Sequence, residues 1–239
     1  MPIDSAWRSR LRLARARGWA WADDYVYAAH RQLRGPFEWR TASRFATGER
    51  APVVLLAGVA EPWTMLLPVA ERLHQAGHPV LVVLELAFNL ASVRSAAAVA
   101  QAAIVEQDLR DVVLVAHSKG GLVGKRLLID DTEERIAALI AIATPFHGSS
   151  LARLLPTPAI TALRPDDPAI LELASSAHVN SKITSIYPAF DPHVPESSLL
   201  DGATNVQLEV MGHFRLLRDS ELLDAVVAAA GRAGQQPAS

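Results

Sequence analysis

Three residues, Ser118, Asp191 and His213, are of the types that together perform nucleophilic catalysis. Ser118 lies within Ala116-His117-Ser118-Lys119-Gly120-Gly121, directly after a run of β-branched and aliphatic residues that is typical of a buried strand. An apolar helical pattern begins immediately after the two glycines. Strand, sharp turn and helix form the setting of a nucleophile elbow, in which a strained turn exposes the serine hydroxyl. The sequence therefore predicts that Ser118 is a nucleophile.

A serine hydroxyl is a poor nucleophile near neutral pH and needs a base within hydrogen-bond reach. His213 follows an expected strand at 206–211 and would accept the proton, whereas Asp191 follows an expected strand at 182–187 and would fix the imidazole tautomer. The chain order serine, acid, histidine agrees with such a triad. If these strands are parallel, their carboxyl ends meet at one edge of the sheet, where the three side chains can assemble.

Composition limits the class of protein. The chain has 239 residues, is 50% hydrophobic and carries a net charge of −2, so we expect one large domain and no nucleic-acid partner. It contains no cysteine, which excludes disulfides and thiol catalysis and fits a cytoplasmic protein. No histidine spacing indicates a metal site, and we expect neither a metal nor an organic cofactor.

Strands and helices alternate regularly from residue 51 onward. We expect strands at the following segments: 52–57, 79–86, 112–116, 136–143, 182–187 and 206–211. Helices are expected at 66–75, 92–109 and 220–230 and directly after Ser118. Continuous apolar strands separated by helices predict a mostly parallel sheet of about six to seven strands, covered on both faces. Residues 232–239 read as a flexible tail.

The first 50 residues differ from the rest of the chain. Arginines interleaved with single apolar residues, together with Trp7, Trp19 and Trp21, do not form a signal peptide. We expect an arginine-rich helix, a second helix at 19–33 and an edge strand at 37–45. Two interpretations stay open: helices that pack on the edge of the domain, or a peripheral contact with anionic lipid.

From residue 52 to about 230 the chain resembles the α/β-hydrolase superfamily, specifically its small bacterial lipase and esterase branch, and is also similar to lipase-like glycolipid deacylase domains. The resemblance rests on the motifs Ala-His-Ser-Lys-Gly-Gly at 116–121, Thr-Pro-Phe-His-Gly-Ser at 144–149, Ile-Tyr-Pro-Ala-Phe-Asp at 186–191 and Gly-His at 212–213. It implies an α/β-hydrolase fold at 51–231 with a small lid at about 150–178. Residues 1–50 lie outside it and form an N-terminal extension.

The resemblance also implies an oxyanion hole made by the backbone N–H groups of Val59 and Lys119. Relatives usually carry histidine before the glycine of this loop, whereas this chain has Ala57 there, which weakens the expected bracing of the loop. For the Lys119 side chain, two interpretations stay open: positive potential beside Ser118, or a solvated ammonium that points away. The lid carries Leu151, Leu154 and Leu155, which we expect to line an apolar acyl pocket.

These features predict a serine hydrolase that cleaves carboxylic esters of small molecules or lipids through an acyl-enzyme. Acyl transfer or thioester hydrolysis with the same triad is the first alternative. A catalytically silent hydrolase fold used for binding is the second, favoured by the missing histidine at position 57. We interpret His117, His147 and His193 as structural residues. The sequence leaves the oligomeric state and the natural substrate open.

Overall fold

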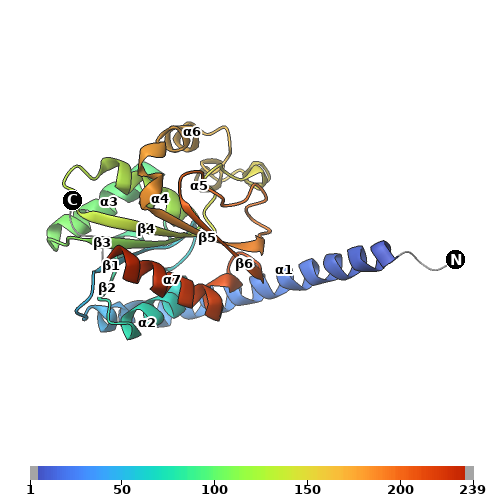
Figure 1. Cartoon of the computed structure of the whole chain (residues 1–239), viewed down its shortest axis with the longest axis horizontal. Helices are drawn as coiled ribbons and strands as arrows, with labels where there is room; N and C mark the ends of the chain where they lie inside the picture. The colour runs from blue at the N-terminus through green and yellow to red at the C-terminus, as the bar shows by residue number, and fades with distance from the viewer. Residues whose placement is uncertain (1–4, 235–239) are drawn as a thin grey trace.

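The computed structural model describes residues 5–234, which form one six-stranded sheet flanked by helices (Figure 1). The strands are β1 (Val53–Leu56), β2 (Val80–Val82), β3 (Val112–His117), β4 (Ile136–Ile142), β5 (Ile183–Phe190) and β6 (Thr204–Met211). Their order in the sheet is β2-β1-β3-β4-β5-β6, and every neighbouring pair is parallel. The expected parallel sheet is confirmed, with six strands.

Each face of the sheet is covered by its own layer of helices. The helices are α1 (Ser5–Glu38), α2 (Leu67–Gln75), α3 (Val93–Glu106), α4 (Lys119–Asp130), α5 (Pro158–Thr161), α6 (Pro168–Ser175) and α7 (Ser220–Ala233). Alternate residues of a strand point to opposite faces. Val53 and Leu55 accordingly pack with α2 and α7, whereas Val54 and Leu56 pack with α3 and α4. Burial on both faces explains why these strands are continuously apolar.

The parallel arrangement brings the loops after β1, β3, β5 and β6 to the same edge of the sheet. These loops begin at Ala57, Ser118, Asp191 and Gly212. The segment between β4 and β5 holds α5, α6 and two short 3₁₀ helices, Ser150–Arg153 and Ala177–Lys182. It occupies the place expected for the lid, beside the same edge.

The N-terminal region differs from its prediction in two respects. One continuous helix, α1, replaces the two expected helices, and it runs through Gly35 and Pro36 to Glu38. No strand forms at 37–45, because residues Trp39–Phe45 form a 3₁₀ helix instead. Phe45 is buried there with its ring 6.2 Å from that of Trp63, and the segment packs against α1, α2 and the edge strand β2 without pairing with the sheet.

Two other expectations, a strand at 79–86 and a tail at 232–239, also differ from the structure or fall partly outside the described residues. The strand expected at 79–86 is limited to Val80–Val82, because Leu84–Leu86 turns into a 3₁₀ helix at this edge of the sheet. Of the expected tail at 232–239, residues 232 and 233 complete α7, and residues 235–239 lie outside the described residues. Within residues 5–234, no helix is both long enough and apolar enough to cross a bilayer.

Candidate active site

Ser118 occupies the sharp turn between β3 and α4. Its backbone has φ 52° and ψ −123°, a region that residues other than glycine rarely adopt. The turn passes so close to β1 that a Cβ atom on Gly120 would lie 2.1 Å from the carbonyl oxygen of Leu56. A glycine is therefore required at position 120. The strain at Ser118 and this close approach are the features of a nucleophile elbow.

Asp191 lies beside His213, as the order of the strands predicts. Oδ2 of Asp191 is 2.8 Å from Nδ1 of His213. The other carboxylate oxygen accepts the backbone N–H groups of His193 (2.7 Å) and Val194 (3.0 Å) in the turn after β5. This arrangement holds the carboxylate in one orientation and presents Nε2 of His213 as the proton acceptor.

The electrostatics of the pair favour a charged imidazole. Burial lowers the pKa of His213, but the charge and hydrogen bond of Asp191, helped by Glu61 and Asp24, outweigh it and hold this pKa above its usual value. Burial opposes ionisation of Asp191 in the same way, but His213 and the backbone N–H of His193 keep the pKa of the carboxyl low. The Asp191 carboxylate can thus stabilise the imidazolium that would form if His213 took a proton from serine.

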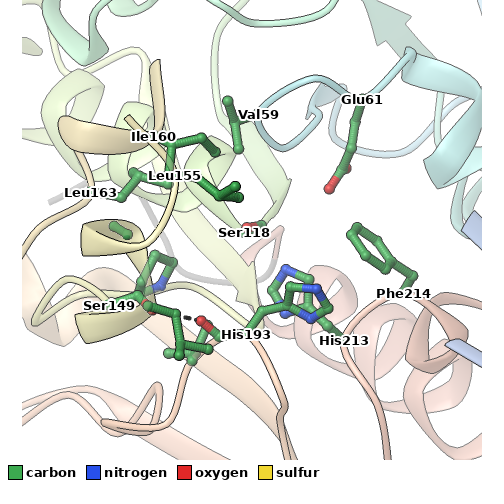
Figure 2. A pocket seen from close by; sticks show the side chains of 14 residues that line it. Val59, Glu61, Ser118, Ser149, Leu155, Ile160, Leu163, His193, His213 and Phe214 are labelled. Atoms are coloured by element: carbon green, nitrogen blue, oxygen red, sulfur yellow. Dashed lines mark hydrogen bonds between the residues drawn. The ribbon is translucent and has the colours of Figure 1, made fainter. Parts of the chain in front are cut away.

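Ser118 and His213 line one pocket, together with His193 and Phe214. Figure 2 shows Ser118 between the apolar side chains of the pocket on one side and the imidazoles on the other. Among the contacts of residues 5–234, none is a hydrogen bond to the Ser118 hydroxyl. Such bonds are commonly long before substrate is bound and tighten in the reacting complex.

The oxyanion hole was expected at the backbone N–H groups of Val59 and Lys119. Val59 lies in the loop after β1, and Lys119 directly follows Ser118. Within the described residues, neither N–H donates to a protein acceptor, so both stay available for an oxyanion. The interpretation of the Lys119 side chain as a solvated ammonium is wrong. This side chain is buried, its ammonium donates to the carbonyls of Asn89 (2.7 Å) and Ala91, and burial lowers its pKa to about 8.

Glu61 and His117 brace the oxyanion loop, a role that the sequence analysis did not assign. The Glu61 carboxylate accepts the N–H of Gly58 (2.9 Å) and lies 2.9 Å from Nδ1 of His117, and both side chains are buried. Nε2 of His117 lies 3.1 Å from the carbonyl oxygen of His213. The pair thus links the loop after β1 to the loop after β6 and supplies the bracing that was expected of a histidine at position 57. An acidic residue three positions after Gly58 was the available signal.

Asp24 of α1 holds the loop that carries His213, which sequence reasoning also missed. Its carboxylate is fully buried and accepts three backbone N–H groups, from His213 (3.1 Å), Phe214 (2.7 Å) and Arg215 (2.8 Å). A Cβ atom on Gly212, which has φ 111°, would lie 2.8 Å from this carboxylate. The carboxylate thus caps, from α1, the first turn of the 3₁₀ helix Arg215–Arg218.

Two further contacts join α1 to the edge of the site. The side chain of Gln32 donates to the carbonyl of Ala60 in the oxyanion loop (2.6 Å). The Tyr25 hydroxyl is 2.9 Å from Nε2 of His193. Burial and the neighbouring charge of His213 lower the pKa of His193 to about 4, so His193 stays neutral at neutral pH and is no substitute for the Asp191–His213 pair.

The pocket is mostly apolar, with a cavity of about 200 Å³. Leu151 and Leu155 line it as expected, together with the following residues of the same segment: Ala152, Ile160 and Leu163. Leu154 was wrongly expected here. It ends the 3₁₀ helix Ser150–Arg153, whose tight turn directs it to solvent, where it is 73% exposed. His147, interpreted as structural, lies 3.2 Å from the carbonyl of Leu199.

Two groups of side chains come close enough to suggest a cation site, namely Glu61 with His117 and His213, and Asp191 with His193 and His213. Hydrogen bonds within these groups explain their proximity, because Nδ1 of His117 faces Glu61 and Nδ1 of His213 faces Asp191. The geometry therefore assigns these atoms to acid–base pairs.

No known sequence family and no curated protein matches the chain. Many solved structures nevertheless share its fold. A lipase from Bacillus licheniformis in its mature form superposes with a TM-score of 0.57 at 15% identity, covering 76% of this chain and 92% of that one. A monoacylglycerol lipase from Paleococcus ferrophilus gives 0.54 at 18% identity, with 77% and 97% covered. A thermophilic esterase from Thermogutta terrifontis gives 0.54 at 16% identity, with 79% and 92% covered. The chain has the α/β-hydrolase fold.

Proposed function

We propose that the protein hydrolyses carboxylic esters through an acyl-enzyme on Ser118. The observation that carries the proposal is the pairing of His213 with Asp191 at 2.8 Å in the same pocket as a serine held in a strained elbow. The fold alone hosts several chemistries, so the support for ester hydrolysis comes from the geometry of this site.

The reaction follows from the positions of these groups. Nε2 of His213 accepts the hydroxyl proton as Oγ of Ser118 bonds to the ester carbonyl carbon, and the carbonyl oxygen becomes an oxyanion between the N–H groups of Val59 and Lys119. The imidazolium, stabilised by Asp191, then gives its proton to the leaving alcohol as the ester bond breaks. Water, deprotonated by His213, attacks the acyl-enzyme, and the serine regains its proton as the acid departs.

The pocket favours an apolar acyl group. Leu155, Ile160 and Leu163 form one wall beside Ser118, so an acyl chain placed there is removed from water (Figure 2). This supports simple alkyl esters or lipid esters as the class of substrate.

A fluorophosphonate probe and p-nitrophenyl esters test the proposal together. Ser149 is the matched control, because it lines the same pocket and its hydroxyl donates to the carbonyl of His193 (2.7 Å), away from any catalytic role. We expect the probe to label wild type and Ser149→Ala but not Ser118→Ala, and ester hydrolysis to be lost only in Ser118→Ala. Labelling of Ser118→Ala, or wild-type protein that neither reacts with the probe nor cleaves any ester of the series, would refute it.

A further inference from the structure

One side of α1 carries an unusual row of exposed apolar side chains, and two of them, Trp19 and Val26, line a groove beside β6. Trp19, Val26, Leu33 and Phe37 are 77%, 67%, 75% and 87% exposed, respectively. The first three recur every seven residues, with the exposed alanines 22 and 29 between them, so they form one stripe along the helix. We call Trp19, Ala22, Val26, Ala29, Leu33 and Phe37 the outer stripe.

The inner side of the same helix already has its partners. Ala20, Asp24, Tyr27 and Arg31 are buried against the domain and recur at helical spacing. The buried contacts of α1 with the domain thus come from its inner side, and the side chains of the outer stripe stay exposed. Large apolar groups gathered on one exposed face are typical of an interaction site.

The charges on α1 identify the partner. Residues 5–22 contain five arginines and no acidic residue. Arg12 and Arg15 lie on the continuation of the outer stripe toward the N-terminus, whereas Arg10 and Arg17 are exposed on the other side of the helix, where the Arg17 guanidinium lies 4.8 Å from the centre of the Phe190 ring. Figure 1 shows this half of α1 projecting beyond the body of the domain, and Arg10, Arg12, Arg15 and Arg17 are exposed there.

These charges argue against a second copy of the helix. Parallel pairing along the outer stripe would place Arg12 and Arg15 against the same arginines, and the stripe has no acidic residue to neutralise them in antiparallel pairing. Asp23, on the neighbouring flank, is already paired with Arg215 and Arg218. An anionic lipid surface matches both properties, because it accepts apolar side chains at its interface and attracts arginines.

We propose that the exposed side of α1 binds peripherally to anionic membrane surfaces. The outer stripe enters the boundary between headgroups and acyl chains, and the arginines extend to the phosphates, as long cationic side chains do at interfaces. The bound helix lies along the membrane plane. Its flank reaches the pocket, because the ring of Trp21 lies 4.7 Å from that of Tyr25, whose hydroxyl contacts His193.

Vesicle sedimentation of the full-length chain tests this proposal without any measurement of activity. Vesicles of pure phosphatidylcholine are compared with vesicles that also contain phosphatidylglycerol, each at low and high salt. We expect binding only to the anionic vesicles, weakened by salt. Trp19→Ser combined with Leu33→Ser, and Arg12→Glu combined with Arg15→Glu, should each weaken binding at least about tenfold.

Two control variants match these changes on other parts of the surface. Leu171→Ser removes an exposed leucine (56%) from α6, on the opposite face of the sheet, and Arg110→Glu reverses an exposed charge before β3. Both should bind as wild type does. No sedimentation at low salt, binding equal for neutral and anionic vesicles, or binding unchanged in the α1 variants overturns the proposal. So does a dimer in ultracentrifugation that dissociates in the Trp19/Leu33 variant while no vesicle is bound.

Discussion

Replacement of Asp24 should impair catalysis although this residue lies outside the hydrolase domain and touches no substrate. The variants are Asp24→Asn, which keeps the shape of the side chain, and Asp24→Ala, which removes its acceptors. The reason is the buried carboxylate that fixes the N–H groups of His213, Phe214 and Arg215. Without it, the loop that presents the catalytic base loses its anchor to α1.

The magnitude follows from these three hydrogen bonds. A hydrogen bond to a charged group contributes about 1.5–3 kcal/mol, and buried donors left without partners cost a similar amount. Water can replace some of the lost hydrogen bonds, and the three bonds share one carboxylate, so their contributions do not simply add. We therefore expect Asp24→Ala to lower the free energy of unfolding by about 3 kcal/mol. Domains are typically stable by about 5–15 kcal/mol, so the variant should still fold. A shift of the base by about 1 Å costs about 100-fold in rate, so kcat should fall about 10- to 100-fold with KM little changed.

Asp24→Asn has a second signature that loss of stability alone cannot produce. The negative charge of Asp24 contributes to the raised pKa of His213, and the neutral amide removes that contribution. The imidazolium is then less favoured, the pKa of His213 falls, and the acid limb of the kcat profile moves to lower pH. The amide keeps one acceptor oxygen for the loop, whereas alanine keeps none. We therefore expect a smaller fall in kcat for Asp24→Asn than for Asp24→Ala.

The assay is hydrolysis of a p-nitrophenyl ester across pH, together with thermal unfolding. Asp23→Asn is the matched control, because the adjacent carboxylate is exposed and pairs with Arg215 and Arg218 at the surface. Such pairs contribute about 0–1 kcal/mol, so this variant should resemble wild type. Folded Asp24→Asn with wild-type kcat and an unmoved acid limb would contradict this prediction. An equal loss of kcat in Asp24→Asn and in the control Asp23→Asn would contradict it as well.

Three further predictions use the same assay. Because the pKa of His213 is raised, wild-type kcat should rise with pH through a midpoint above 6.5, and a midpoint below 6.5 would contradict this assignment. Glu61→Gln weakens the support of the oxyanion loop and should lower kcat about tenfold at unchanged KM; an equal change in KM would contradict a role confined to the transition state. Leu163→Trp fills the acyl pocket and should shift preference toward short-chain esters, whereas Leu154→Trp, at an exposed position, should not.

The N-terminal helix cannot be tested cleanly by truncation. Removing residues 1–34 would delete both the exposed arginines and Asp24, so membrane binding and the position of His213 would be lost together. Trp7, Trp19 and Trp21 of this helix are all exposed. Substitutions on the outer stripe separate the two roles of α1, because they leave its inner side intact.

The residues of the candidate site were readable from the sequence because the signals for them are local. A buried strand followed by Ser118 and two glycines specifies the elbow through backbone sterics alone, and parallel strands bring the loops that follow them to one edge. Asp191 and His213 could therefore be placed from their positions after β5 and β6. The lid segment was recognisable by its length, but the direction of each leucine was not, as the outward position of Leu154 shows.

The supports of the site were decided only by the tertiary structure. Glu61 and His117 are 56 residues apart, and Asp24 and His213 are 189 residues apart. No periodicity or spacing connects such pairs, because their contact depends on how α1 docks and how the loops close after the sheet has formed. The sequence by itself determined the α/β order and the candidate nucleophile, acid and base. Which buried carboxylates hold these groups in place depended on packing between distant segments.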